Sequence, residues 1–331
     1  MGVKHLNSYF LANTASTSIQ KKQFEYCRKK TIVIDTSIYL YKFLCEDAYM
    51  EQLYLFLSLI HHYEIQPIFI FDGKTPPEKK ALIKRRYQEK KSAESRYDEL
   101  HIQLLACKKG SKEFIGICKE LEELRKKMAR LKNEHFVLAK QLMDAFGYIY
   151  YDAPGEADQL CAYFVKSGKA WACLSDDMDM FLLGCPRVLR SISLFHHTWI
   201  LYDTECILND LNMSLQDLID IVLLSGSDYS IINENQPSVS LKSLLDIHKN
   251  NYVKDDVDKS NGFYKWYCNK TNISIEIVPT ELLYSLFDIS INTNMLESFC
   301  KMYSEVDVSI NNKIKLEEIK QLMTPNGFIF L

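Results

Sequence analysis

Acidic residues stand where apolar segments of this chain begin or end, and this pattern constrains the fold more than any other feature. Asp35 closes the run Thr-Ile-Val-Ile-Asp, and Asp72 closes Ile-Phe-Ile-Phe-Asp. Five more acids lie at the ends of later elements: Glu156, Asp158, Asp177, Asp179 and Asp228. In an open α/β sheet, groups at the carboxyl ends of the strands face one crevice. The sequence therefore predicts an α/β fold whose central sheet carries one acidic edge.

The order of apolar and charged segments predicts how the sheet is built. Strands are expected at residues 31–34, 67–71, 148–151 and 170–174. Helices are expected at 50–63, 74–107 and 112–146, with shorter ones starting near 37 and 156 and within 237–249. Strands that alternate with helices imply right-handed βαβ crossovers and a mostly parallel sheet flanked by helices. Gly147 is the expected residue after the helix at 112–146.

Composition excludes several classes of protein. Hydrophobic residues make up 47% of the 331 residues and charged residues 25%, as in ordinary folded domains. The ten cysteines include no Cys-x-x-Cys pair, so they indicate reduced thiols in an intracellular protein rather than a zinc site. No apolar run reaches the length of a membrane span, and no signal peptide is visible, so no membrane partner is expected.

Charge is distributed unevenly along the chain. The formal net charge is −3, yet residues 74–96 carry nine Lys or Arg against three Glu. A basic segment beside an acidic pocket suits a phosphate-rich partner, with cations at the centre and positive side chains at the rim. Most basic runs are simply solvated helix faces, and that interpretation stays open for this one.

Clustered carboxylates point to bound divalent cations. Two carboxylates about 4 Å apart repel by a few kcal/mol at an effective dielectric near 20, so a cluster requires positive charge. Oxygen ligands favour Mg²⁺ or Mn²⁺ over zinc, and such ions support hydrolysis of phosphate esters. Any single acid here is also explained as a helix cap or turn residue. The spacing of two between Glu156 and Asp158, and again between Asp177 and Asp179, favours the metal interpretation.

A phosphatase of the haloacid dehalogenase type is a competing interpretation of Asp177-Met-Asp179. That scheme expects Thr or Val two positions after the second Asp, whereas Met180-Phe181 follows here. It also leaves Asp35, Asp72 and Asp228 without a role, and is therefore disfavoured.

Six motifs, taken together, resemble the flap endonuclease/XPG family of structure-specific 5′ nucleases in order and spacing. They are Met-Gly-Val-Lys-His-Leu at residue 1, Val-Ile-Asp-Thr-Ser-Ile-Tyr, Phe-Asp-Gly-Lys-Thr-Pro-Pro, Ala-Pro-Gly-Glu-Ala-Asp, Ser-Asp-Asp-Met-Asp and Gly-Ser-Asp-Tyr. The resemblance runs from Met1 to about Lys249. It implies a PIN-like core with a helical arch insertion and a degenerate helix-hairpin-helix-like segment.

The resemblance also implies a division of the chain and an activity. One compact domain would comprise an N-terminal nuclease region (1–95), the arch (96–146), an internal nuclease region with the hairpin segment (147–250) and a C-terminal region of uncertain role (251–331). The implied activity is a 5′ flap endonuclease with 5′ exonuclease activity on branched DNA. Alternatives are a nuclease for bubbles or four-way junctions, a DNA-binding protein without activity, and a PIN-type ribonuclease.

By the same resemblance, each acid acquires a place around two Mg²⁺ ions, for which Mn²⁺ would substitute. Asp35, Asp72 and Asp158 would hold one ion, with Glu156 acting through water. Asp177 and Asp179 would hold the second ion, with Asp228 near both.

Basic and aromatic residues would handle the DNA. Lys79 or Lys80, and Arg85 or Arg86, correspond to the family's catalytic Lys and Arg, and the doublets leave the register open. Tyr41 aligns with an aromatic residue that stacks a base, although it also suits a helix core. Further expected DNA contacts are Gly2, Lys84, Arg125, Lys126, Lys127, Arg130 and Lys132.

Two departures from the family affect partners. Residues 233–237, Asn-Glu-Asn-Gln-Pro, replace the family's Gly-x-Gly hairpin, so the duplex contact is weakened or rebuilt. The C-terminal segment lacks the sliding-clamp motif. These differences suggest a divergent branch, such as one from a large DNA virus. The protein is expected to be a monomer that acts in the nucleus or, if viral, at a cytoplasmic replication site.

Overall fold

The computed structural model describes residues 3, 5–74, 79–225, 239–253, 262–271, 287 and 314–330. The chain divides into two compact units, each assembled from three separate segments. The first unit comprises Met1–Asp35, Ile60–Lys74 and Tyr151–Ile310, and the second comprises Thr36–Leu59, Thr75–Tyr150 and Asn311–Leu331. The single compact domain with four consecutive regions stays a prediction.

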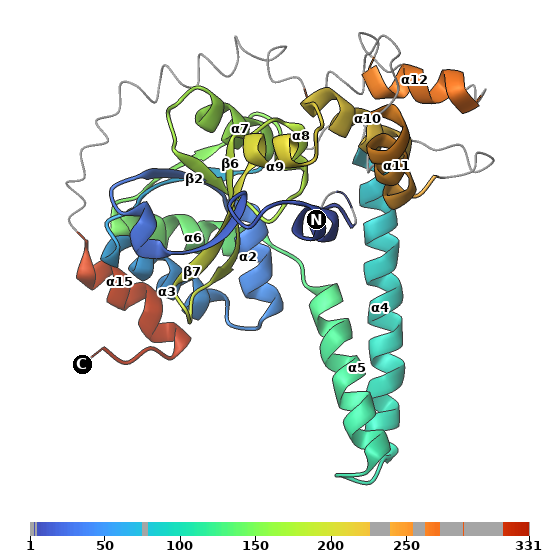
Figure 1. Ribbon diagram of the computed structural model, residues 1–331. Coiled ribbons are helices and arrows are strands. Elements are labelled where there is room, and N and C mark those ends of the chain that lie inside the picture. Colours follow the sequence, from blue (N-terminus) through green and yellow to red (C-terminus); the bar gives the residue numbers. More distant parts are fainter. Residues whose placement is uncertain are drawn as a thin grey trace. The chain divides into compact units, whose positions relative to one another are not determined.

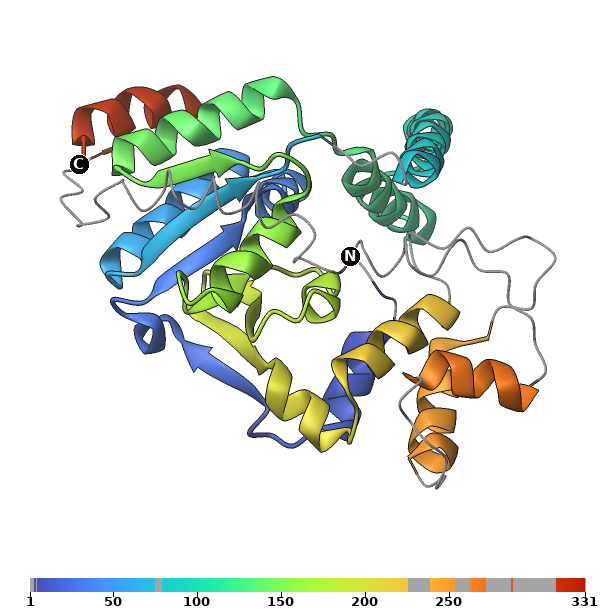
Figure 2. The same cartoon turned by 90° about the horizontal axis from the view of Figure 1, so that it is seen from above.

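A seven-stranded sheet forms the core of the fold, in the order β1-β7-β6-β5-β2-β3-β4 (Figures 1 and 2). The central pairs β2–β3, β2–β5 and β5–β6 are parallel, whereas β6–β7 and β7–β1 are antiparallel. The strands are β1 (Ile19–Gln23), β2 (Thr31–Asp35), β3 (Gln66–Phe71), β4 (Ile149–Asp152), β5 (Ala172–Leu174), β6 (Arg187–Ser193) and β7 (Thr198–Asp203). The expected strands are confirmed to within two residues.

The central strands are apolar along nearly their whole length because both faces of a parallel sheet are covered. Ile32, Val33 and Ile34 of β2 are fully buried. A bulge interrupts β6, where the pairing with β7 shifts between Arg190 and Ser193. Ser191, inside this bulge, has a left-handed φ of 52°.

Helices complete the first unit. Helix α7 (Ala157–Lys166) packs against β2, β3 and β5, and its apolar face, including Leu160 and Phe164, is buried. The other helices that lie within this unit are α1 (Leu6–Asn13), η1 (Phe24–Cys27), α8 (Asp179–Leu182), α9 (Thr204–Asp210), α10 (Leu215–Ser225), α11 (Leu241–Ile247), η3 (His248–Tyr252) and α12 (Gly262–Thr271).

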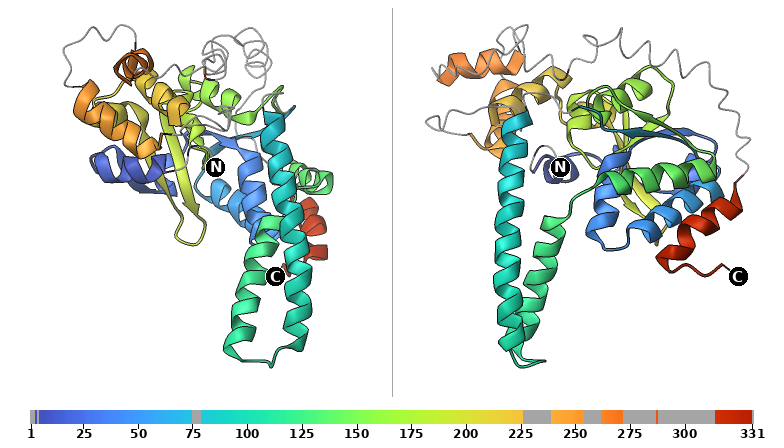
Figure 3. Two further views of the ribbon diagram at one scale, coloured as in Figure 1. Left: turned by 90° about the vertical axis from the view of Figure 1, so that its right-hand side faces the viewer. Right: turned by 180° about the vertical axis from the view of Figure 1, so that it is seen from behind.

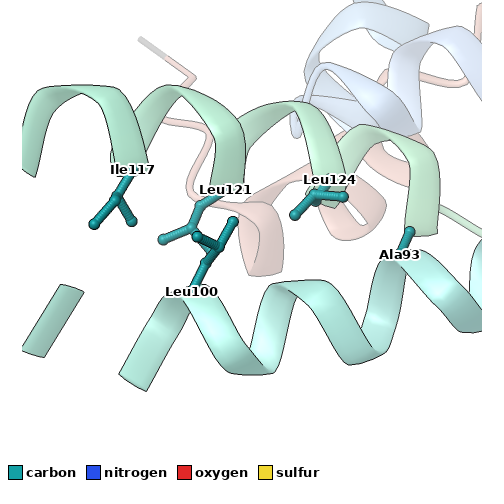
Figure 4. Close-up of a cluster of buried hydrophobic side chains, with 5 residues drawn as sticks. All are labelled: Ala93, Leu100, Ile117, Leu121 and Leu124. Atoms are coloured by element: carbon teal, nitrogen blue, oxygen red, sulfur yellow. The ribbon is translucent and has the colours of Figure 1, made fainter. Parts of the chain in front are cut away.

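The second unit is helical. Its elements are α2 (Thr36–Cys45), most of α3 (Tyr49–His62), α4 (Lys80–Ala106), α5 (Lys112–Met128), α6 (Asn133–Phe146), α15 (Leu316–Met323) and η5 (Thr324–Asn326). Helices α4 and α5 run side by side as an antiparallel pair (Figure 3). The side chains buried between them are Ala93, Leu100, Ile117, Leu121 and Leu124 (Figure 4). Helices α4 and α5, together called the arch below, therefore form a helical hairpin with its own apolar seam, whereas the expected bounds of 96–146 stay a prediction.

The prediction of one continuous helix over residues 112–146 is wrong. Two helices, α5 and α6, occupy this range, and between them Ala129 (ψ 135°) has left the helical conformation and Lys132 is extended. Lys90 Nζ donates to the Ala129 carbonyl at 2.8 Å, and the Lys132 amide donates to His135 Nδ1 at 2.9 Å. The apolar repeat continues in phase across the break, so periodicity alone does not reveal it. None of the described helices is long and apolar enough to cross a membrane.

Candidate functional site

The first acid of the site is the last residue of a central strand. Asp35 ends β2 and is only 4% exposed, because the neighbouring parallel strands enclose it. Ser175 follows β5, the strand beside β2, and its hydroxyl donates to Asp35 Oδ2 at 2.9 Å. One neutral donor thus satisfies part of a buried carboxylate, which keeps the remaining oxygen positions for other ligands.

The second and third acidic motifs are joined by three hydrogen bonds. The Ala153 amide donates to the Phe71 carbonyl at 2.8 Å, and the Gly73 amide donates to the Gly155 carbonyl at 2.7 Å. The Ala157 amide then donates to Asp72 Oδ1 at 2.9 Å. This pairing brings the end of β3 against the start of α7.

Glycine is required at position 73 by this pairing. A Cβ atom there would lie 1.8 Å from the Ala153 carbonyl oxygen, far inside van der Waals contact. The sequence suggests only a turn at Asp72-Gly73, whereas the structure reveals a close backbone approach. Asp158 lies in the first turn of α7, where the helix dipole favours a carboxylate, and Glu156 is the residue before that helix.

The loop after β5 orders the next acids. The Asp177 amide donates to the Ser175 hydroxyl at 3.1 Å, and the Asp179 amide donates to Asp177 Oδ1 at 3.1 Å. Asp179, which begins α8, is 6% exposed. Asp176 is bonded differently, because its carboxylate accepts the Ser191 amide at 2.7 Å. The Asp176 carboxylate is therefore bonded to β6 rather than to the loop that holds Asp177 and Asp179.

Electrostatics show that acids from separate segments share one environment. The pKa of Asp35 is raised well above its ordinary value, first by burial and then by the negative charges of Asp72 and Asp158. The Ser175 hydrogen bond lowers it, and Asp177 raises it further. The charges of three other predicted acids thus act on Asp35, and all four residues belong to the first unit.

The donor set of this site is suited to a hard divalent cation. It consists of carboxylate oxygens, the ligands that Mg²⁺ and Mn²⁺ prefer, and positive charge would offset the repulsion at Asp35. Within the described residues, no three His, Cys, Asp or Glu side chains converge closely enough to form a metal site. Asp228, the seventh acid, lies outside the described residues, as does Gly2.

Basic residues at the start of α4 belong to the second unit. Lys79 caps that helix and is half-buried, and Lys80 is its first residue, with a side chain outside the described part. Lys84 and Arg85 are exposed, and Arg85 lies 3.7 Å from Glu89. Lys80, Arg85 and Arg86 therefore lie on one helix, with Lys79 at its N-cap, and their catalytic role stays a prediction.

Tyr41 of α2 contacts this basic segment. It is half-buried, and Lys90 Nζ lies 5.3 Å from its ring centroid. Burial raises the pKa of Tyr41, and the positive charge of Arg86 opposes that shift. Within the Arg85-Arg86 doublet, Arg86 is therefore the member whose charge acts on Tyr41.

The predicted DNA contacts of the arch are mostly engaged in ion pairs. Arg125 contacts Asp47 at 2.8 Å, and Arg130 contacts Glu94 at 2.6 Å. Two more pairs are Lys126–Glu122 at 3.2 Å and Lys132–Glu134 at 3.5 Å. Among the described residues, Lys127 has no such partner. Exposed pairs of this kind contribute about 0–1 kcal/mol, so phosphates can compete for these cations.

Two family models match the segments that carry these acids, and a known flap endonuclease is similar in sequence. The models of the XPG N-terminal domain and the XPG I-region match residues 1–93 and 147–228, which contain all seven acids. Flap endonuclease 1 of Methanococcus aeolicus is 30% identical over 259 residues, covering 72% of this chain and 76% of that protein.

Solved structures share the fold. The catalytic core of Rad2 in complex with DNA substrate gives a TM-score of 0.59 at 18% identity, covering 98% of this chain and 94% of that one. The Holliday junction-resolving enzyme GEN1, in complex with product DNA and Mg²⁺, gives 0.61 at 14% identity, covering 97% of this chain and 72% of that one. With its two matching family domains and its similarity to flap endonuclease 1, the chain belongs to the flap endonuclease/XPG family of structure-specific nucleases.

Proposed function

We propose that this protein is a Mg²⁺-dependent nuclease that hydrolyses phosphodiesters near the base of 5′ flaps and also acts as a 5′ exonuclease. One observation carries the proposal. The buried carboxylate of Asp35 shares its environment with Asp72, Asp158 and Asp177, which come from three other segments of the chain. Unpaired buried charge is costly, so such an arrangement fits a site that acquires cations.

Two Mg²⁺ ions are assigned to these acids. Asp35, Asp72 and Asp158 would hold one, with Glu156 acting through water, and Asp177 and Asp179 would hold the other, with Asp228 near both. When bound, the ions supply an activated water and neutralise the leaving oxygen of an in-line displacement. Ser175 orients Asp35, and the Ala157 amide orients Asp72.

The basic segment of α4 is assigned to the scissile phosphate. Lys79 or Lys80 would neutralise its charge together with Arg86, which we favour over Arg85 because its charge acts on Tyr41. Tyr41 would stack a base, an interaction worth about 1–3 kcal/mol. Gly2, Lys84, Arg125, Lys126, Lys127, Arg130 and Lys132 would contact the DNA backbone.

A second candidate function is cleavage of bubbles or four-way junctions. The GEN1 structural similarity favours it, as does the replaced glycine hairpin at residues 233–237, since altered duplex contacts would change the preferred substrate. We further propose that the protein acts as an intracellular monomer.

Cleavage assays with labelled substrates distinguish these functions. Flap, bubble, four-way and single-stranded DNA, with RNA hairpins, are incubated in Mg²⁺ or EDTA. The expected result is a Mg²⁺-dependent cut near the flap base that Asp179→Ala abolishes and Glu205→Ala, at an exposed acid of α9, leaves intact. Activity that persists in EDTA or in Asp179→Ala would contradict the metal assignment. Preference for RNA hairpins would favour a PIN-type ribonuclease instead.

A further inference from the structure

Arg190 is a buried cation that none of the proposed steps uses. It lies in β6, is 8% exposed, and packs over the ring of Tyr202 with its Cζ 5.4 Å from the ring centroid. Its NH2 group donates to the Asp176 carbonyl at 2.7 Å, and its NH1 group donates to Asn7 Oδ1 at 2.8 Å. One guanidinium thus ties helix α1 to the acidic loop, within the first unit.

Two neighbouring residues at the bulge in β6 donate hydrogen bonds to Asp176. Ser191, left-handed at this bulge, donates its backbone amide to Asp176 Oδ1 at 2.7 Å, while the Arg190 side chain donates to the carbonyl of the same residue at 2.7 Å. Two neighbouring residues of β6 therefore hold Asp176, one through its backbone and one through its side chain. Bulges are commonly found next to active sites, where they redirect side chains.

Asp176 is the central residue of the loop that orders the acids. Ser175 before it binds Asp35, and Asp177 after it bonds to Ser175 and to the Asp179 amide. Fixing the backbone of Asp176 therefore fixes where the carboxylates of Asp177 and Asp179 lie. A displacement of about 1 Å at such a site costs on the order of 10²-fold in rate.

The guanidinium of Arg190 is only partly satisfied by its neighbours. No carboxylate within the described residues forms an ion pair with Arg190, and its buried Nε has no hydrogen-bond partner there. An apolar residue would avoid both penalties. With Nε unsatisfied, the bonds that Arg190 does make, to the Asp176 carbonyl and to Asn7, point to a role in ordering the acidic loop.

We propose that Arg190 is a positioning residue that fixes Asp177 and Asp179 through the backbone of Asp176. The inference rests on the proposed nuclease function. Arg190 does not touch the reacting phosphate, so its loss lowers kcat without weakening DNA binding.

The test compares Arg190→Met, Arg190→Lys and Tyr202→Phe in single-turnover cleavage of a 5′ flap, with DNA binding measured in EDTA. Tyr202→Phe is the control for packing around the guanidinium, because it removes a hydroxyl that donates to Asn7 Oδ1 at 2.8 Å and neighbours Arg190, yet leaves the Arg190–Asp176 bond. Arg190→Met should lose about 10²-fold in kcat with Kd within threefold, and Arg190→Lys should recover about tenfold of that loss and stay below wild type. Tyr202→Phe should keep kcat within threefold whatever its Tm.

Several outcomes would overturn the proposal. Three results would each show a purely structural role: wild-type kcat in Arg190→Met, a loss of DNA affinity as large as its loss of kcat, or an equal loss of kcat in Tyr202→Phe. Should Arg190→Met not fold, Arg190→Lys decides, because reduced kcat at unchanged Kd supports the inference and wild-type kcat removes it. Asp179→Ala runs alongside, and full activity in that variant would contradict the nuclease assignment itself.

Discussion

The Asp72 carboxylate accepts a hydrogen bond of 2.9 Å from the Ala157 amide, 85 positions away in the chain. This bond joins the end of strand β3 to the first residue of helix α7 and completes a short backbone pairing through Gly73 and Gly155. Two acidic motifs therefore form one structural element, and a change in either backbone should disturb both.

Gly73→Ala is expected to lower the free energy of unfolding by about 3 kcal/mol, because the new Cβ would overlap the Ala153 carbonyl oxygen. Activity should fall with it, since Asp72 and Asp158 would separate. Gly155→Ala is the matched control, as no atom lies within 4 Å of its added Cβ. Urea denaturation of both variants measures the difference, and equal stability would mean that the pairing is looser than described.

Asp35→Asn should stabilise the metal-free protein while abolishing cleavage. The substitution removes a buried charge that Asp72, Asp158 and Asp177 repel, and Asn still accepts the Ser175 hydrogen bond. A gain of about 1 kcal/mol in EDTA is expected. Mg²⁺ should raise the Tm of the wild type and not that of the variant, because binding to the folded state stabilises it. Thermal unfolding with and without Mg²⁺ provides the measurement, and a lower Tm for Asp35→Asn in EDTA would argue against charge repulsion at this site.

Asp217 should make the first unit sensitive to acid. Burial raises the pKa of Asp217, but contacts with His248 and Ser214 outweigh it and leave the pKa below its ordinary value. The Ser214 hydroxyl donates at 2.7 Å, and His248 Nε2 lies at 3.6 Å, an ion-pair distance. A depressed carboxyl pKa stabilises the fold above the unfolded value of about 3.9, and this contribution is lost as the pH falls below it.

Asp217→Asn should therefore cost about 1–3 kcal/mol at pH 7, with the deficit shrinking below about pH 4. Tyr252 beside this pair has a pKa raised to about 12, chiefly by burial, and stays neutral across that range. Denaturant unfolding from pH 3.5 to 7 tests the prediction. A deficit that does not change with pH would assign the effect to packing.

Leu121→Ala should loosen the arch without changing the acidic site. Leu121 is 8% exposed in the seam between α4 and α5, and its truncation should cost about 2 kcal/mol locally. Ile102→Ala on α4 is the control, since Ile102 is 70% exposed. Hydrogen exchange of α4 and α5 should accelerate only in Leu121→Ala, and identical exchange in the two variants would contradict the role of the seam.

Sequence alone predicts the parts of this fold that depend on local pattern. Apolar runs identify β2, β3 and β5. Because these strands are parallel, the acids that follow their carboxyl ends are expected at the same edge of the sheet. Helix α7 begins one residue after the expected Glu156. The shared environment of Asp35 and Asp72 could also be expected, because parallel neighbours end at the same edge.

The remaining features depend on contacts between distant segments. Nothing near Gly73 in the sequence reveals that Ala153 will approach its backbone, and Arg190 appears as one more polar residue of a strand. The break between α5 and α6 is hidden for a related reason, because Lys90 and Ala129 meet only after the hairpin closes. Hydrogen bonds of this kind have no periodic signature.

The bulge in β6 has a consequence for how this chain tolerates length changes. Insertions in the turn between β6 and β7, residues 194–197, leave the partners of Asp176 in place. One residue added between Leu189 and Ser191 would carry Arg190 or Ser191 away from that loop and reverse which face each side chain occupies. The turn of this hairpin can therefore change in length, whereas the number of residues in β6 is fixed by the contacts of Arg190 and Ser191 with Asp176.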